Sequence, residues 1–259
     1  MPKLQIIGCS SGMPEPDIAT SSYLLKFKGK LYLLDCGEGT SSAMLRLKIN
    51  YKRIEDIFIS HSHSDHIIGI PIFIQMNHIA GRSTPLNIYL PPELIEPMRG
   101  LLYASYLFPE TLSFEWRLFA LKPNPIFRNE DITINIFPNR HLSVYNDFIK
   151  AGKLSNNMES YCFSISTAKT KMVYSGDLKD VADLDGILKG SNLLLTEGMH
   201  IDITQLLKSA SEYGVRSVIL THLPSKLKSK HRLNKIKMAA KKFGLKEIYI
   251  AYEGAVYNY

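Results

Sequence analysis

The sequence His61-Ser62-His63-Ser64-Asp65-His66 decides the fold, and it follows the apolar run Asp56-Ile57-Phe58-Ile59-Ser60. Three histidines and one aspartate within six residues are ligand types that zinc prefers in proteins. Residues two apart on an extended chain point the same way, so His61 and His63 can hold one ion as a pair. The chain then turns, which lets Asp65 and His66 face a second ion. The hexapeptide therefore predicts a metal site.

The bulk properties agree with one globular domain over residues 1–259. The hydrophobic content of 45% is ordinary for such a protein, and no apolar run approaches the ~18 residues that span a bilayer, so we expect no membrane partner. The start, Met1 to Gly8, is expected to be a strand rather than a signal peptide. Three scattered cysteines, Cys9, Cys36 and Cys162, predict buried thiols and a cytoplasmic location.

Short strand-like runs alternate with helical patterns along the chain. Runs rich in Val, Ile, Leu and Tyr indicate strands, and apolar spacing such as Ile203, Leu206 and Ala210 indicates helices. We expect helices on the outer faces of sheets. The proline-rich segment 91–129 is expected to combine a helix with irregular structure, and the polar segment 139–158 is expected to be a loop. The expected strands are Leu4–Ile7, Ser22–Phe27, Leu31–Asp35, Ile57–Ser60, Leu86–Leu90, Ile132–Phe137, Tyr161–Ser166, Met172–Ser175, Leu193–Thr196, Ser217–Leu220 and Glu247–Ile250, and the expected helices are Thr40–Leu47, Ile203–Tyr213 and Lys230–Phe243.

The hexapeptide resembles the His-x-His-x-Asp-His motif of the metallo-β-lactamase superfamily. This resemblance implies an α/β fold, the αββα four-layer sandwich, with two divalent ions. Zinc is the expected metal, although histidine and carboxylate ligands also suit manganese or iron.

The remaining metal ligands of the superfamily have matches here in the same order, each after an expected strand. His141 follows 132–137 and resembles the histidine that completes a three-histidine site with His61 and His63. Asp177, in Ser175-Gly176-Asp177, resembles the carboxylate that bridges both metals. His222, in Thr221-His222, resembles the last ligand, which joins Asp65, His66 and Asp177 on the second ion.

The chain is most similar to ribonuclease Z and its phosphodiesterase relatives. The stretches Ile7 to Pro14, Leu34 to Thr40 and Gly69-Ile70-Pro71 carry this resemblance, together with the later residues from Thr196 to His222.

The same resemblance implies roles for three further residues. His200 matches a histidine that gives a proton to the leaving oxygen, a role that suits a side chain titrating near neutral pH. Glu197 matches the acid that orients this histidine. Asp35 matches an aspartate that braces the metal ligands without necessarily binding metal.

Some features depart from ribonuclease Z. His200 is followed by Ile201-Asp202 instead of Ser-Thr, and the last histidine is followed by Leu223-Pro224. Only the 35 residues 142–176 separate His141 from Asp177, which leaves no room for the protruding arm that grips tRNA. A small phosphodiester is therefore at least as good a substrate expectation as RNA.

The resulting hypothesis is a metal-dependent hydrolase that acts as a phosphodiesterase or a ribonuclease Z-like nuclease. A metal-bridging hydroxide, held by Asp65 and Asp177, would attack phosphorus, and His200 with Glu197 would protonate the departing alkoxide. The first alternative is a hydrolase of lactones, thioesters or other acyl compounds on the same site. The second is a binding or structural member of the fold without catalysis. Dimers are common in the family that the chain resembles, so a homodimer is also an expectation.

The net charge of +7 is distributed unevenly. Residues 226–246 hold nine Lys or Arg and no acid, which predicts a basic helix. Such a segment is either a solvated helix face or a surface that contacts nucleic acid.

Overall fold

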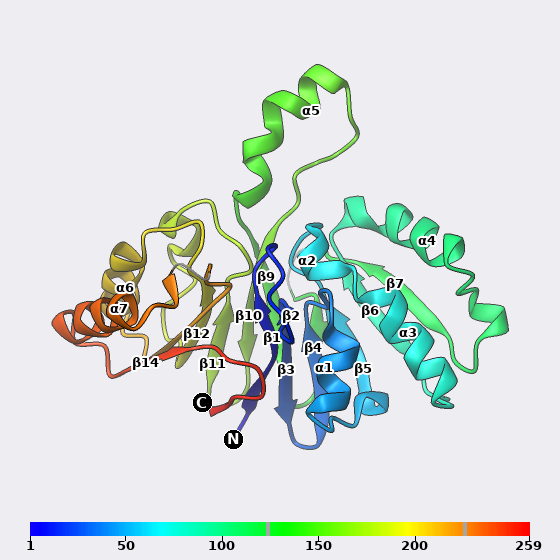
Figure 1. Ribbon diagram of the computed structural model, residues 1–259, viewed down its shortest axis with the longest axis horizontal. Coiled ribbons are helices and arrows are strands. Elements are labelled where there is room, and N and C mark those ends of the chain that lie inside the picture. The colour runs from blue at the N-terminus through cyan, green and yellow to red at the C-terminus, as the bar shows by residue number, and fades with distance from the viewer. Residues whose placement is uncertain (123–124, 225–226) are drawn as a thin grey trace. The chain divides into compact units, whose positions relative to one another are not determined.

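Two mixed β-sheets organise the chain, and each belongs to its own unit in the computed structural model (Figure 1). The structure describes residues 1–122, 125–224 and 227–259. The first unit holds residues 1–122 and 252–258, and the second holds residues 123–251 with Tyr259. The prediction of a single domain over 1–259 stays a prediction.

The sheet of the first unit has the strand order β15-β1-β3-β4-β5-β6-β7, with β2 paired to β1. Strands β15, β1, β3 and β4 pair antiparallel, and β4 through β7 pair in parallel. Because the parallel strands end at one edge, the segments after β4 and β5 lie side by side. The strands are β1 (Lys3–Ser10), β2 (Ala19–Thr20), β3 (Ser22–Phe27), β4 (Lys30–Leu34), β5 (Ile54–Phe58), β6 (Leu86–Leu90), β7 (Trp116–Ala120) and β15 (Val256–Asn258).

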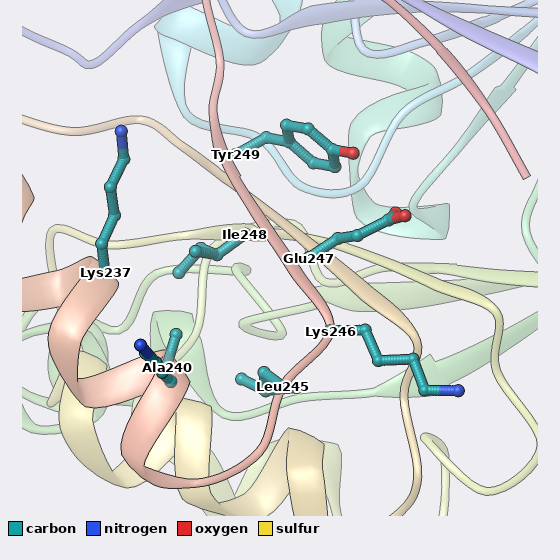
Figure 2. A pocket seen from close by; sticks show the side chains of 8 residues that line it. Lys237, Ala240, Leu245, Lys246, Glu247, Ile248 and Tyr249 are labelled. Atoms are coloured by element: carbon teal, nitrogen blue, oxygen red, sulfur yellow. The ribbon is translucent and has the colours of Figure 1, made fainter.

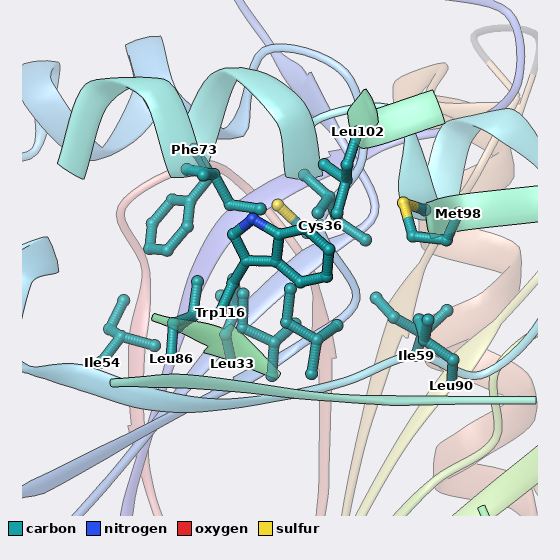
Figure 3. Packing of buried hydrophobic residues seen from close by; sticks show 14 of the residues in the cluster. Leu33, Cys36, Ile54, Ile59, Phe73, Leu86, Leu90, Met98, Leu102 and Trp116 are labelled. Carbon is teal, nitrogen blue, oxygen red and sulfur yellow. The ribbon is translucent and has the colours of Figure 1, made fainter. Parts of the chain in front are cut away.

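Helices of the first unit bury the apolar face of this sheet. Figure 3 shows Trp116 of β7 packed among side chains that include Leu33, Cys36 and Phe73. The Trp116 indole donates a hydrogen bond of 2.8 Å to the Leu107 carbonyl, so its polar edge is satisfied inside the core. The helices are α1 (Thr40–Arg46), α2 (Ser64–Ile67), α3 (Ile70–Ile79) and α4 (Ile95–Ala104), with 3-10 turns η1 (Tyr51–Arg53), η2 (Pro92–Leu94) and η3 (Pro109–Thr111).

The second unit repeats the same plan with the strand order β14-β13-β12-β11-β10-β9-β8. Strands β8 to β11 pair antiparallel, and β11 to β14 pair in parallel. The carboxyl ends of β11, β12 and β13 therefore meet at one edge. The strands are β8 (Phe127–Arg128), β9 (Thr133–Pro138), β10 (Tyr161–Ser166), β11 (Lys171–Tyr174), β12 (Leu193–Glu197), β13 (Ser217–Thr221) and β14 (Glu247–Ile250).

Two amphipathic helices, α6 (Ile203–Glu212) and α7 (Lys230–Lys242), pack beside the parallel strands of the second sheet (Figure 1). Asp202 caps α6, because its carboxylate accepts hydrogen bonds of 2.7 Å and 3.2 Å from the amides of Thr204 and Gln205. The departure Ile201-Asp202 from ribonuclease Z thus has a structural role. The remaining elements are η4 (His141–Tyr145), α5 (Asn146–Gly152) and η5 (Val181–Leu184).

Several elements differ from the sequence expectations, among them β5, which is Ile54–Phe58 rather than Ile57–Ser60, and the short elements β2, α2 and β15, which were not predicted. The segment 91–129 contains the strands β7 and β8 besides α4, although its prolines suggested irregular structure. The segment 139–158 is not a loop throughout, since η4 and α5 form in it. Helix α3 was not predicted, because its sequence is apolar on most sides and lacks the spacing of an amphipathic helix.

None of the helices in the described parts of the chain is both long and apolar enough to cross a membrane.

Candidate metal centre

The hexapeptide of the first unit leaves β5 and turns into the short helix α2. The ring of His61 lies 4.8 Å from that of His63 and 4.1 Å from that of His66, between ring centroids. The Nε2 atom of His66 lies 3.6 Å from the Asp65 carboxylate. His61 and His66 are buried, and His63 and Asp65 are half-buried. The structure therefore brings together the four ligand-type residues that the hexapeptide supplies.

Asp35, directly after β4, holds this cluster by hydrogen bonds. Its carboxylate lies 2.6 Å from Nδ1 of His66, and it accepts hydrogen bonds from the Ser60 amide at 2.7 Å and the Ser60 hydroxyl at 2.8 Å. Asp35 is fully buried and adopts a left-handed φ of 57°. Aspartate tolerates this conformation better than most residues. Asp35 thus contacts the histidine that the resemblance expects it to brace.

Glycine is required where the loop after β4 passes the hexapeptide. A Cβ atom on Gly37 would lie 2.1 Å from both the Asp65 carbonyl oxygen and Thr20 Oγ1. The Cys36 amide donates a hydrogen bond of 2.8 Å to the His66 carbonyl. The backbone of this loop therefore fixes the position of Asp65 and His66.

In the second unit, Asp177 lies at the centre of three histidines. Its carboxylate oxygens lie 3.8 Å from Nε2 of His141, 3.7 Å from Nδ1 of His200 and 3.4 Å from Nδ1 of His222. Asp177 follows β11, and His222 follows β13 with a left-handed φ of 53°. Asp177, His141 and His222 are buried. The structure therefore brings together three predicted metal ligands and the predicted proton donor.

Glu197, the last residue of β12, holds the loop that presents His200. One carboxylate oxygen accepts hydrogen bonds from the amides of Met199 at 2.6 Å and His200 at 2.9 Å, and the other accepts one from Leu178 at 3.3 Å. The His200 ring nitrogen Nδ1 lies 3.4 Å from the same carboxylate. The His200 side chain is 34% exposed, which leaves it accessible to a substrate.

Asn139 belongs to this site, although no role for it was predicted from the sequence. Its side-chain oxygen accepts a hydrogen bond of 3.0 Å from the His141 amide, and its side-chain nitrogen donates one of 3.0 Å to the Asp177 carbonyl. One buried amide thus joins the loops that carry two predicted ligands. Its place between a strand and His141 was the available signal, but asparagine there also suits an ordinary turn.

Two buried thiols near these clusters do not belong to the donor set. Burial raises the pKa of both Cys36 and Cys162 to about 12. Among the described residues, neither thiol contributes an atom to the two groups of ligand atoms that lie within 4.8 Å of one another. The donors that remain are imidazole nitrogens and carboxylate oxygens, a set that fits a divalent cation such as zinc.

Residues 2–242 match the family described as "Anti-Pycsar protein Apyc1". The chain belongs to this Apyc1 family. It is also 26% identical over 275 residues to a ribonuclease Z of Methanothermobacter thermautotrophicus, which covers 88% of each chain. A ribonuclease Z of Treponema denticola is 38% identical over 135 residues, covering 51% of this chain and 42% of that protein. Several further ribonucleases Z are likewise matched over less than half of their own length.

The fold of this Apyc1-family chain is that of a solved relative. The metallo-β-lactamase fold protein YhfI of Bacillus subtilis superposes with a TM-score of 0.78 at 23% identity, covering 99% of this chain and 98% of that one. The predicted superfamily and its ribonuclease Z-like branch are therefore confirmed. The relatives also confirm the prediction of a metal-dependent hydrolase.

Proposed function

We propose that this protein is a phosphodiesterase that uses two divalent ions, with zinc as the metal, and acts on a small phosphodiester. The observation that carries the proposal is the buried carboxylate of Asp177, which faces a nitrogen atom of each of three histidines. A carboxylate surrounded by imidazole nitrogens in this way suits a group that binds cations.

The proposed ligands form two groups, as in the family that the chain resembles. His61, His63, His141 and Asp177 would hold one ion. Asp65, His66 and His222, with Asp177 shared, would hold the other. Histidine nitrogen and carboxylate oxygen are the donor types in both groups. When bound, the ions lower the pKa of a water molecule and stabilise charge on the phosphoryl group.

The chain's own residues supply orientation and protons. Asp65 and Asp177 accept hydrogen bonds from the attacking water and so aim it at phosphorus. His200, partly exposed beside Asp177, donates a proton to the leaving oxygen. Glu197 stabilises the protonated form of His200 and holds its backbone in place.

A chelation experiment tests the proposal. Purified protein is assayed with bis(p-nitrophenyl) phosphate before and after removal of metal, and the metal content of the same samples is measured. Turnover that disappears with the metal and returns with added zinc is expected. Protein that keeps full turnover without metal, or that holds metal and hydrolyses no phosphodiester, would contradict it.

We propose small phosphodiesters rather than tRNA as substrates because of the length of one segment in the second unit. Residues 141–176 contain η4, α5, β10 and β11, and they lack room for a long tRNA-gripping arm. The family description refers to an anti-Pycsar protein rather than to a tRNA-processing enzyme. Parallel assays with small cyclic phosphodiesters and a tRNA precursor separate the two substrates.

RNA remains a second candidate because of one surface. All six Lys or Arg of α7 are exposed, and Lys237, Lys241 and Lys246 border a hollow of about 440 Å³ beside β14 (Figure 2). A basic helix without acids suits a phosphate backbone. Lys226 of the predicted basic segment lies outside the described residues. RNA binding that weakens steeply with salt, and with Lys237→Glu and Lys241→Glu, would favour this candidate.

We propose three further properties, two of which have direct tests. Hydrolysis of a lactone or thioester panel, with no turnover of phosphodiesters, would favour the acyl alternative. A homodimer is tested by light scattering of the purified chain. A cytoplasmic location is proposed from the three buried free cysteines.

A further inference from the structure

Ser60 links two histidines of the hexapeptide to one carboxylate. Its hydroxyl oxygen lies 2.8 Å from Asp35 Oδ2 and 3.0 Å from Nδ1 of His61. Asp35 Oδ2 also lies 2.6 Å from Nδ1 of His66. Asp35, Ser60 and His61 are fully buried, and His66 is 1% exposed. The contacts are therefore shielded from water.

The direction of each hydrogen bond follows from what the groups can donate. An ionised carboxylate only accepts, and a serine hydroxyl carries one proton. A bond to a charged acceptor is stronger than a bond to a neutral one, so the Ser60 proton lies on the Asp35 side. The hydroxyl oxygen then accepts a hydrogen bond that the N–H group at Nδ1 of His61 donates.

This arrangement sets the tautomer of His61. With the proton on Nδ1, the lone pair lies on Nε2, the nitrogen that a cation would use. The tautomer of His66 is set in the same way, but by a direct hydrogen bond from its Nδ1 to Asp35. The Asp35 carboxylate thus contacts the His66 ring directly and reaches the His61 ring through the Ser60 hydroxyl. Hydrogen bonds of this kind orient metal-binding histidines and make them better ligands.

We propose that Ser60 is a positioning residue. Its hydroxyl connects the Asp35 carboxylate to His61 by hydrogen bonds and so increases the affinity for the ion held by His61 and His63. The inference rests on the proposed function, because it concerns the same metal centre. It goes further by assigning the direct Asp35–His66 contact and the Asp35–Ser60–His61 path to different ions. Asp35 serves both ions. The Ser60 hydroxyl acts mainly on the ion at His61, because its oxygen lies 3.0 Å from Nδ1 of His61 but 3.5 Å from Nδ1 of His66, which Asp35 already contacts at 2.6 Å.

The first test measures metal affinity rather than turnover. Competition with a chelator yields the two binding steps of wild type and variants, and His63→Ala identifies the step that belongs to the His61 ion. Ser60→Ala is expected to weaken that step about 10- to 100-fold and to leave the other little changed. Ser60→Thr keeps the hydroxyl and should restore wild-type affinity. Asp35→Asn should weaken both steps.

Ser62→Ala is the matched control. The Ser62 hydroxyl is buried in the same segment and makes no hydrogen bond among the described residues. Its loss removes the same atoms without removing the relay, so both binding steps should stay at wild-type values. An equal effect of Ser60→Ala and Ser62→Ala would overturn the inference. So would an equal weakening of both steps by Ser60→Ala.

The second test uses the wild-type protein, so it does not depend on the folding of a variant. Nitrogen-15 NMR of the metal-free wild-type protein reports the tautomer of each histidine. A proton on Nδ1 of His61 is expected, and a proton on Nε2 would contradict the relay. This measurement also separates the two proposals. A chain that binds no metal would overturn the proposed function, while the tautomer of His61 would still decide the role of Ser60.

Discussion

The two units present their candidate ligands in opposite ways. The first unit supplies four of them from one hexapeptide, whose backbone conformation brings their side chains together. The second unit supplies His141, Asp177 and His222 from three separate strand ends, aligned by the pairing of β9 to β13. In the first case local geometry builds the site. In the second case the sheet builds it, so no short motif describes it.

This difference also appears in how each cluster is supported. In the first unit, Asp35 and Ser60 hold the histidines by side-chain hydrogen bonds. In the second unit, Asn139 and Glu197 hold loop backbones. Variants of the first kind should change the properties of individual ligands, one for Ser60 and two for Asp35, and variants of the second kind should move whole loops.

The largest expected effect comes from Asp177→Ala, which removes the carboxylate at the centre of the second unit's cluster. We expect phosphodiester hydrolysis to fall by at least about a thousandfold, because several kcal/mol of electrostatic stabilisation are lost. Metal content should fall as well. Asp147→Ala, at an exposed aspartate of α5, is the control and should behave as wild type. A folded Asp177→Ala variant with normal activity would remove the second unit from the mechanism.

The next effect distinguishes proton donation from metal binding. His200→Ala should keep its metal but lose about 10²- to 10⁴-fold in kcat on a phosphodiester with an alkyl leaving group. Bis(p-nitrophenyl) phosphate should suffer less, because p-nitrophenolate leaves without needing a proton. His78→Ala, which alters a histidine bonded to Ser113 outside the metal centre, should change neither substrate. Equal losses on both substrates would argue against His200 as the proton donor.

A smaller effect concerns the close packing in the first unit. Gly37→Ala should destabilise the fold by about 1–3 kcal/mol and displace Asp65, because the new Cβ meets the Asp65 backbone and Thr20. Gly100→Ala, in α4, is the matched control, since a Cβ there meets no atom within 4 Å. Alanine in a helix should stabilise by up to about 1 kcal/mol. Denaturant titrations of both variants measure the difference, and equal stabilities would contradict the packing argument.

The smallest effect is a lack of reactivity. Burial raises the pKa of the Cys36 and Cys162 thiols to about 12, so thiolate is scarce near neutral pH and rises only at strongly alkaline pH. Folded protein should resist alkylation of both residues at pH 7, and denatured protein should react at once. Rapid labelling of either residue in folded protein would show that its thiol is not buried as described.

The sequence predicted the first unit's cluster more directly than the second's. Six adjacent residues carried their own chemical signal, so His61 to His66 were found without knowledge of the sheet. Asp177 and His222 were found only through the order of ligands in a resembling family. Asn139 and Ser60 were not assigned roles, because a hydrogen bond to a distant loop leaves no trace in local sequence.

The fold shows the same limit. Strands β3, β6, β10 and β14 have the predicted bounds, since each is a short apolar run. Strand β7 was hidden in a proline-rich segment and is a strand because β6 pairs with it. Helix α5 was hidden by its polar sequence and none of its residues is buried. Tertiary context, rather than local propensity, decided these elements.

Metal counting tests most directly the proposed assignment of His61, His63 and His141 to one ion. His63→Ala removes a ligand from the first unit, and His141→Ala removes one from the second. Wild type is predicted to hold two ions per chain, and each single variant and the double variant are predicted to hold one. Losses that add up in the double variant, or two ions retained by either single variant, would contradict this assignment.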